Sequence, residues 1–567
     1  MTTDTKPWDF LNEYRGTLFK GEWPTLPEMF RITVQRYGGR PCFTVYEPDR
    51  ISLNYDEAME RIQKVARWLR AQGIRKGDTV AVTGKNSPEW AVAYLGILFS
   101  GAVVVPIDYQ LRNEELDLLM KTADTRILFV DEEKHETYGK APGKLKAVVS
   151  LKSGLGTYIY DLDGPQADME RAEVEDLAAI LFTSGTTGVP KGVMLTHKNL
   201  VSDCYLAQSN LTVYPTDVFY ALLPIHHSYT MLAVFIEAIS AGSEIVFGKK
   251  MVTKAILKDL KEAKITMFLG VPMLFNKVLA GIMRGIKAKG PVAYGLIRTL
   301  MALSGMVKKL FKVNPGKKIF HSVLDKASLA TIRICISGGG PLAPSVFKQY
   351  NQLGIDFIQG YGLTETSPIV TLNPVEHYKE TSVGRLSDQV EMKILDPDER
   401  GVGEIAIKGP MVMKGYYKMP EETAAVFTQD GWFKTGDLGY LDDEHYLYLT
   451  GRAKNLIVTE GGKNVYPEEI ENEFQLYDEI EQILVRGYLM DVKMKVEGIE
   501  ALVYPNPEFF KTAEGTLKAK AEIQKRMDGI IAEVNQRMLP YQRIERITVL
   551  DQAMEMTTTK KIKRNAV

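Results

Sequence analysis

The sequence predicts an α/β fold with more than one domain. Helical and strand patterns alternate along the first long part of the chain, glycine-rich turns then separate short strands, and a smaller βα pattern follows a change in composition near residue 451. Strands that alternate with helices are typical of parallel sheets covered by helices. We therefore expect a large first domain over residues 1–451 and a small second domain over residues 452–567.

The first domain begins with alternating helices and strands. Trp90–Ile107 carries no charge and is nearly long enough to cross a bilayer, but two glycines and a proline interrupt it. This favours a buried helix, a turn and a short strand. The predicted order is helix Tyr55–Gln72, strand Thr79–Val82, helix Asn86–Phe99, strand Val103–Val105, helix Asn113–Thr122 and strand Ile127–Val130.

The second domain is predicted to be a smaller α+β unit. Pro467 followed by Glu468 and Glu469 marks a helix start, because proline suits the first turn and acidic side chains favour the positive end of the helix dipole. The predicted elements are strand Asn455–Thr459, helix Glu468–Leu476, strands Ile483–Gly487 and Ala501–Tyr504, helix Lys518–Gln536 and strand Arg546–Val549.

The bulk composition is that of an ordinary soluble protein. A chain of 567 residues with a formal net charge of −1 holds a large core and gives no reason to expect nucleic-acid binding. Cys42, Cys204 and Cys335 are widely spaced, which fits reduced thiols and no metal site. The first residues lack the features of a signal peptide, so we expect a cytoplasmic protein.

One segment departs from this neutral composition. Lys287–Lys326 is rich in lysine, and Leu296–Phe311 within it has the pattern of an amphipathic basic helix. Two interpretations remain open: a solvated helix in an insertion, or a surface that contacts an anionic membrane, which would place the protein at the periphery of the inner membrane.

The most informative motif is Leu181–Gly192, which places hydroxyl side chains, glycines and one lysine between two apolar runs, Ala178–Phe182 and Val193–Leu195. Inward-facing backbone amides of a glycine-rich turn bind anionic oxygens. The hydroxyls supply further hydrogen-bond donors, and the lysine supplies a positive charge. It is not a Walker A loop, because Pro190 and Gly192 flank Lys191. Such clusters are often plain solvated loops, but the composition suits a phosphate clamp.

The string TSGTTGVPKG, residues 183–192, resembles the signature of the adenylate-forming superfamily, which includes acyl-CoA synthetases, firefly-type luciferases and peptide-synthetase adenylation domains. The resemblance implies a β-barrel-like subdomain in the large domain and a mobile small domain. It also implies that ATP phosphates bind to Thr183, Ser184, Gly185, Thr186, Thr187, Gly188 and Lys191.

Two further strings follow in the order of that family. Ser337–Leu342, SGGGPL, comes after the apolar strand Ile332–Ile336, and its glycines Gly338, Gly339 and Gly340 imply a turn against which adenine lies. Gln359–Thr366, QGYGLTET, begins with Gln359, and Gly360 and Gly362 flank Tyr361 and expose its ring. The resemblance implies that Tyr361 packs on the adenine, Thr364 contacts the phosphates and Glu365 helps hold Mg²⁺, a cation that prefers oxygen ligands.

The next strings concern the nucleotide sugar and the domain hinge. In Phe433–Gly439, FKTGDLG, Asp437 is expected in a tight glycine-bounded turn, where a carboxylate accepts bonds from both ribose hydroxyls. The resemblance implies that Arg452 also reaches the sugar and that Lys454 is the hinge. Taken alone, each is an ordinary charge at a strand end.

The last strings belong to the small domain. By resemblance, the loop with Gly461, Gly462 and Lys463 swings to the active site in the second half-reaction and lines the tunnel for the pantetheine of coenzyme A. Lys561 in MTTTKKIKR resembles the catalytic lysine, although Lys560 stands where the family commonly has glycine, so both stay open. Without the resemblance this ending is a solvated basic tail.

A histidine pair marks the expected acyl site. In LLPIHHSY, His227 matches the family residue that closes the acyl pocket, whereas a lone histidine is more often structural. The apolar Met231–Ile239 segment is compatible with a tunnel wall, and core packing explains it equally well.

The resemblance covers Tyr55–Arg564 and implies ATP-dependent conversion of a carboxylic acid to an acyl-adenylate and then to an acyl-CoA. The insertion at Lys287–Lys326 and the ending MTTTKKIKR resemble those of long-chain fatty acid ligases, which implies a long-chain fatty acid as the substrate. ATP, Mg²⁺ and coenzyme A would take part. Thr183, Lys191 and Glu365 would screen the negative charge of the ATP phosphates during adenylation. Lys561 would serve that first step, before the small domain rotates about Lys454.

Several alternatives stay open. In the first the acyl acceptor is an acyl carrier protein, and in the second the acid is medium-chain or aryl. In the third the chain is an inactive nucleotide- or lipid-binding regulator. Against the third, Lys561, Glu365 and Asp437 all keep the functional residue type. A homodimer is compatible with the sequence.

Overall fold

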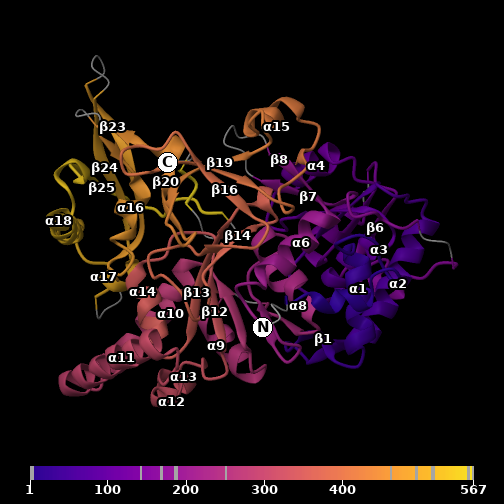
Figure 1. The fold of residues 1–567 in the computed structure, drawn as a ribbon, viewed down its shortest axis with the longest axis horizontal. Helices are drawn as coiled ribbons and strands as arrows, with labels where there is room; N and C mark the ends of the chain where they lie inside the picture. The colour runs from indigo at the N-terminus through magenta and orange to yellow at the C-terminus, as the bar shows by residue number, and fades with distance from the viewer. Residues whose placement is uncertain are drawn as a thin grey trace.

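The computed structural model describes residues 6–140, 143–166, 170–183, 190–249, 252–459, 463–491, 496–512, 517–557 and 562–564. Two large sheets and their helices form the body of the molecule, and smaller sheets from the later part of the chain lie against it (Figure 1). This confirms the predicted α/β class.

The first large sheet has seven strands among the described residues, and its centre is parallel. Its valine-rich strands are buried on both faces, which is usual for parallel sheets covered by helices. Helices α4 (Asn113–Thr122) and α5 (Glu132–Tyr138) cover one face. The strand order is β18 (Gly415–Tyr416), β8 (Lys191–Thr196), β7 (Leu177–Thr183), β4 (Val103–Ile107), β3 (Thr79–Thr83), β5 (Ile127–Val130) and β6 (Ala147–Ser150).

The second large sheet has nine described strands, parallel in the middle and antiparallel at both edges. Side chains alternate between its faces: Ile334 and Ile336 enter the central core, while Cys335 enters an outer core. The order is β15 (Arg385–Leu386), β14 (Ile369–Leu372), β13 (Asp356–Gly362), β12 (Ile334–Ser337), β11 (Met267–Gly270), β9 (Val218–Ala221), β10 (Glu244–Phe247), β1 (Pro41–Val45) and β2 (Ile51–Asn54).

Helices lie between the two sheets and outside the second one. The central core joins one face of each sheet through the inner helices, several of which begin at a capping side chain such as Thr25, Asn54 or Ser87. The inner helices are α1 (Leu26–Tyr37), α2 (Tyr55–Ala71), α3 (Pro88–Phe99), α6 (His197–Ala207), α7 (Ser228–Thr230), a π-helical turn (Met231–Ile236) and α8 (Glu237–Ala241). The outer helices are α9 (Thr253–Glu262), α10 (Pro272–Lys287), α11 (Pro291–Phe311), α12 (Gly316–Ile319), α13 (His321–Lys326) and α14 (Pro344–Gln352).

An antiparallel sheet of four described strands follows in the later part of the large domain, for which the family resemblance implies a β-barrel-like subdomain. Its strands are β16 (Glu391–Leu395), β17 (Gly403–Lys408), β19 (Phe433–Leu441) and β20 (Leu447–Arg452), and the helix α15 (Pro420–Val426) lies between the second and third in sequence.

The last part of the chain has a core of its own, formed by buried residues between Ile457 and Ile544. The junction near residue 451 stays a prediction; the strand β20 ends at Arg452. The elements are β21 (Ile457–Val458), β22 (Asn464–Val465), α16 (Pro467–Asn472), β23 (Ile480–Asp491), β24 (Val496–Pro505), α17 (Pro507–Phe510), α18 (Lys520–Arg537) and β25 (Arg546–Val549).

Two predicted elements differ in detail. The strand expected over Asn455–Thr459 is split into a 3-10 turn and the short β21, and the helix expected to reach Leu476 ends at Asn472, where tighter turn bonds replace the helical ones. The uncharged run Trp90–Ile107 forms α3 and β4. No helix in the described part of the chain is long and apolar enough to cross a membrane.

A buried histidine makes the fold sensitive to pH. His197 is 1% exposed, and its Nδ1 accepts the backbone N–H of Leu26 at 3.3 Å. Burial lowers the pKa of His197 from 6.5 to about 4; the opposing charges of Asp176 and Lys76 have smaller effects. Because the unfolded chain takes up this proton at a higher pH than the folded chain, stability should be lost as pH falls from about 6.5 to about 4.

We predict that wild type loses up to about 3 kcal/mol more unfolding free energy across that window than His197→Gln. Urea unfolding at a series of pH values measures this. The exposed His321→Gln should keep the wild-type pH dependence. Parallel curves for wild type and His197→Gln would contradict the assignment.

Candidate functional site

The glycine turn and the tyrosine strand predicted from sequence lie on neighbouring strands. Gly338–Gly340 follows the end of β12, and Gln359–Gly362 forms the end of β13, with Ser337 paired to Gln359. Because parallel strands end at the same edge of a sheet, both segments meet there, which is the usual place for a ligand in such sheets.

The turn after β12 presents backbone because side chains do not fit there. A Cβ on Gly338 would lie 2.8 Å from the ring of Tyr229, and Gly339 has a φ of +78°. The Tyr229 hydroxyl donates to the carbonyl of Ile336 at 3.1 Å and fixes the ring against the strand. Tyr229 is a site residue that the motifs did not single out.

Three predicted nucleotide residues form one hydrogen-bonded cluster. The Tyr361 hydroxyl donates to Oδ2 of Asp437 at 2.8 Å, and Arg452 Nε lies 3.0 Å from Oδ1 of the same carboxylate. Burial, together with Asp437, raises the pKa of the Tyr361 hydroxyl well above its ordinary value, so it remains a donor. Asp437 in turn raises the pKa of Arg452. The cluster fixes a 6% exposed carboxylate between a phenol and a guanidinium.

The structure corrects the expected setting of Asp437. The residue lies within the nine-residue strand β19, opposite Arg452 in β20, and not in a tight turn. Gly436 has a φ of +71°, and the pairing register shifts after Leu438. These glycine-dependent irregularities bend the strand without ending it. Tyr361 is partly buried, with its hydroxyl engaged, where an exposed ring was expected.

A second cluster joins the start of β8 to Glu365. Lys191 pairs with Thr183 across β7 and β8, and its Nζ lies 4.8 Å from the centroid of the Tyr416 ring. The Tyr416 hydroxyl donates to Oε1 of Glu365 at 2.9 Å. The structure therefore brings the predicted phosphate-binding lysine and the predicted metal ligand together through Tyr416.

Tyr416 was missed because its signal in the sequence is weak. It follows Gly415 in the two-residue strand β18, which pairs with β8, and nothing in a Gly-Tyr pair indicates a ligand. Only the long-range pairing reveals its position.

The expected acyl segment lies beside the phosphate threonine. Ser228, which follows His227, has its hydroxyl 3.0 Å from that of Thr364. His227 is partly buried, while its neighbour His226 is buried with Nε2 3.7 Å from Asp108 Oδ1. Burial lowers the pKa of His226.

The π-helical turn Met231–Ile236 is packed in the central core, where Phe235 lies edge-on to Tyr94 with ring centroids 5.3 Å apart. Such turns occur often at functional sites. Core packing accounts for these side chains, and a role as tunnel wall stays a prediction.

The residues of the small domain are placed only in part. Lys454 is exposed in a 3-10 turn, where desolvation and the charges of Arg452 and Arg564 lower its pKa. Lys463 lies at the base of the β21–β22 hairpin, where its backbone N–H donates to Thr459 Oγ1 at 3.2 Å. No hydrogen bond or ion pair between described residues joins the Lys463 side chain to the Asp437 cluster.

Arg564 is another residue that the motifs did not assign a role. Its Nη2 lies 2.6 Å from both carboxylate oxygens of Glu471, and its Nη1 donates to the carbonyl of Val485 at 2.9 Å. Met556 pairs with Ile562 in an isolated bridge. These contacts anchor the described residues on both sides of the predicted catalytic lysine.

Eight predicted site residues lie outside the described residues, and so does the alternative lysine, Lys560. The eight are Ser184, Gly185, Thr186, Thr187, Gly188, Gly461, Gly462 and Lys561.

The oxygen ligands available fit magnesium held jointly with a phosphate. Within the described ranges no group of three or more histidine, cysteine or acidic residues gathers to hold a metal. Glu365 offers a carboxylate with only Oε1 engaged by Tyr416 among the contacts found in those ranges. A single carboxylate is sufficient for Mg²⁺, which usually keeps several waters and binds substrate phosphates.

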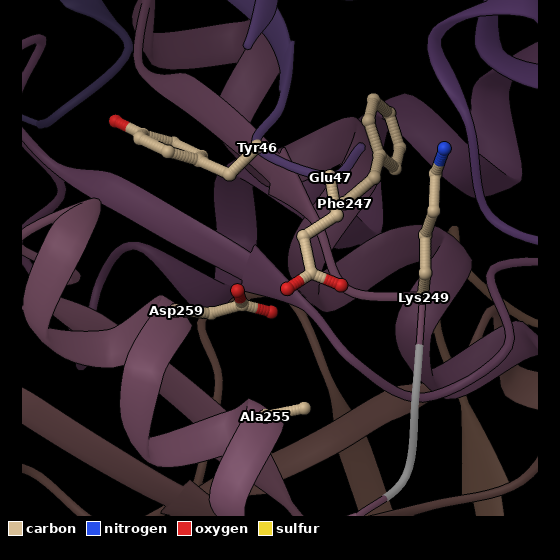
Figure 2. Close-up of a pocket in the computed structure, with 6 residues that line it drawn as sticks. All are labelled: Tyr46, Glu47, Phe247, Lys249, Ala255 and Asp259. Atoms are coloured by element: carbon tan, nitrogen blue, oxygen red, sulfur yellow. The ribbon is translucent and has the colours of Figure 1, made fainter. Parts of the chain in front are cut away.

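A small pocket elsewhere contains none of the predicted site residues. Tyr46, Glu47, Phe247, Lys249, Ala255 and Asp259 line it (Figure 2). Asp259 accepts the Tyr220 hydroxyl at 2.7 Å, and Glu47 lies 3.1 Å from Lys258. These contacts give its acidic groups structural partners.

Comparison with known proteins shows which family and fold this chain resembles. The family model described as AMP-binding enzyme matches residues 30–417. A feruloyl-CoA synthase of Amycolatopsis sp is 30% identical over 82% of this chain and 85% of its own length. The long-chain-fatty-acid–CoA ligase FadD15 of Mycobacterium tuberculosis is 30% identical over 90% of this chain and 89% of its own. The crystal structure of ATP-bound MatB from Rhodopseudomonas palustris superposes with a TM-score of 0.74, at 27% identity, over 96% of this chain and 98% of that one.

The glycine after Tyr361 is predicted to be essential for stability. A Cβ on Gly362 would lie 1.4 Å from the carbonyl oxygen of Pro368. Gly362→Ala should therefore cost about 3 kcal/mol or more of unfolding free energy, measured in urea. Gly281→Ala in α10, where nothing lies within 4 Å of the added Cβ, should instead stabilise by up to about 1 kcal/mol. Equal stability of Gly362→Ala and wild type would show that the close approach is not present.

Proposed function

We propose that this chain, which belongs to the AMP-binding enzyme family, converts a long-chain fatty acid into its acyl-CoA by way of an acyl-adenylate. The family consists of acyl-adenylate-forming ligases. The choice of a long-chain acid and of coenzyme A as acceptor is the part we propose.

The observation that carries the proposal is the Asp437 cluster. Tyr361 and Arg452 hold this carboxylate in place before any ligand binds. The Tyr361 hydroxyl lies 2.8 Å from one carboxylate oxygen, and Arg452 Nε lies 3.0 Å from the other. A fixed carboxylate is well suited to accept both hydroxyls of a ribose, and the glycine backbone after β12, exposed at Gly339, is well suited to a flat base. This arrangement therefore supports nucleotide binding.

The phosphates would lie toward Lys191 and Glu365. In the first half-reaction a carboxylate oxygen attacks the α-phosphorus of ATP, and the bond from that phosphorus to the bridging oxygen breaks to release pyrophosphate. Like charges oppose this attack. Lys191 and the hydroxyl of Thr183 are placed to screen them, and Tyr416 orients Glu365. Bound Mg²⁺, held by Glu365 and the phosphates, would supply further charge neutralisation.

The second half-reaction would use a different part of the small domain. The sulfur of coenzyme A attacks the acyl carbon, the carbon–oxygen bond to the phosphate breaks, and AMP leaves. We infer that Lys561 serves the first step, and that rotation about Lys454 replaces it with the Gly461–Lys463 loop. The Arg564–Glu471 ion pair lies within the small domain and anchors the chain three residues after Lys561, so Lys561 would move together with that domain.

Two observations support a long-chain fatty acid as the substrate. The relative FadD15 is a long-chain-fatty-acid–CoA ligase, and the apolar Met231–Ile236 turn lies near the Ser228–Thr364 contact. Another relative of equal identity is a feruloyl-CoA synthase, and aryl acids are therefore the alternative substrates to test.

Mass spectrometry of products tests the proposal. The protein is incubated with ATP, Mg²⁺, coenzyme A and a pool of carboxylic acids from short to very long, with and without an acyl carrier protein. We expect AMP together with long-chain acyl-CoA. Aryl or medium-chain acyl-CoA would overturn the chain length, acyl carrier protein product alone would overturn the acceptor, and ATP binding without turnover would favour an inactive regulator.

Separate assays of the two half-reactions test the division of labour. Lys561→Ala should lower acyl-adenylate formation by about a thousandfold, since charge stabilisation by one positioned group is worth this much, while thioester formation from supplied acyl-adenylate stays within about threefold of wild type. Lys560→Ala is the matched control and should leave both rates nearly unchanged. Equal loss of both half-reactions in Lys561→Ala, or a larger loss in Lys560→Ala, would contradict the assignment.

A further inference from the structure

Helix α11 exposes a continuous apolar stripe. Eight of the nineteen large apolar side chains that are exposed in the described part of the chain fall between Val292 and Ile319. On the helix itself the spacing is four, then seven, three and four residues, so the side chains share one face. These are Val292, Leu296, Leu303, Met306 and Leu310, each 51–85% exposed.

The stripe is not part of the packing that holds the helix in place. The opposite face, with Met301 fully buried and Tyr294 and Ile297 partly so, packs on the outer core of the nine-stranded sheet. The buried Lys308 also points inward and lies 2.6 Å from Asp356. The helix lies at the edge of the molecule, away from the smaller sheets (Figure 1). Its outer face is therefore available without any change of fold.

The surroundings of the stripe are strongly basic. The chain as a whole is almost neutral, yet residues 263–324 contain eleven lysines and arginines and no aspartate or glutamate. Arg298 and Lys309 are about three turns apart and so lie on the same flank of α11. Six exposed basic residues here form no ion pair with another described residue: Lys287, Lys289, Arg298, Lys309, Lys312 and Lys318.

We propose that α11 docks the protein on the surface of an anionic lipid bilayer, with the stripe in the outer part of the acyl chains. A 21-residue helix is about 31 Å long, and an amphipathic helix of this kind lies in the plane of the interface. Lysine and arginine stems run along the apolar zone while their charged ends reach the lipid phosphates.

The charge and the apolar stripe together favour an anionic membrane over a second copy of the chain and over an acidic carrier protein. A second copy of the chain would bring Arg298 and Lys309 against the same residues, and like charges beside an apolar seam oppose pairing. An acidic carrier protein would satisfy the lysines, but recognition by charge does not require a row of large side chains more than half exposed. An anionic membrane satisfies both the basic and the apolar features. The inference is independent of the proposed substrate.

Co-sedimentation with vesicles tests the proposal. The full-length protein should bind vesicles that contain phosphatidylglycerol at least about tenfold more strongly than vesicles of phosphatidylcholine alone, with binding weakened by salt. The triple variant Leu296→Ser, Leu303→Ser, Leu310→Ser should lose about tenfold or more. Arg298→Gln with Lys309→Gln and Lys318→Gln should lose both the preference for anionic vesicles and the salt dependence.

The matched control changes exposed leucines elsewhere: Leu118→Ser, Leu476→Ser and Leu539→Ser, which are 50–52% exposed. This variant should bind as wild type does. Urea unfolding of each variant shows that the fold is retained. Equal losses in the control and the stripe variant, or equal binding to both kinds of vesicle, would overturn the proposal.

A fluorescence measurement places the helix directly. Leu303→Trp should be quenched by lipids brominated on their acyl chains, whereas Leu118→Trp should not be. Absence of quenching at position 303 would overturn the proposal. So would a stripe variant that changes only self-association in light scattering, or only the capture of an acyl carrier protein.

Discussion

The candidate site depends on one carboxylate held from two sides. Asp437 comes from the four-stranded sheet, Tyr361 from the nine-stranded sheet, and Arg452 from the strand that leads into the small domain. A nearly buried carboxylate is costly unless it is paired and hydrogen-bonded, and these two partners meet that requirement. The three-way contact therefore fixes the relative position of segments more than seventy residues apart and leaves a polar group ready for a ligand.

Close packing of backbone around this contact explains the glycines near it. Gly362 leaves no room for a Cβ beside Pro368, and Gly338 leaves none beside Tyr229. Lys191, Tyr416 and Glu365 then extend the site along the pairing of β18 with β8. Tyr361 of the first cluster and Glu365 of the second lie four residues apart in the chain, as the proposal that one ATP molecule contacts both clusters requires.

The sequence predicts local elements well because their signals are local. Helix α2 and strands β3, β4 and β5 follow from hydrophobic periodicity and glycine turns, and all four lie within a few residues of their predicted bounds. The motif residues Tyr361, Asp437 and Arg452 were expected to bind one nucleotide, and the structure places them in contact.

The remainder depends on long-range pairing. Asp437 was expected in a turn because glycines surround it, but strand pairing with β20 overrides that local preference. Tyr416 and Arg564 have no motif, and their positions follow only from pairing with β8 and from the contact with Glu471. The exposure of the α11 stripe could not be read from periodicity alone, since both faces of that helix carry apolar residues and only packing shows which face is covered.

The central claim is that this site forms an acyl-adenylate from ATP. The most direct measurement is the exchange of labelled pyrophosphate into ATP, without coenzyme A, in the presence and absence of long-chain fatty acids. We expect exchange that requires the acid and is greatly reduced in Asp437→Asn. Tight ATP binding with no acid-dependent exchange for any carboxylic acid tested would contradict it.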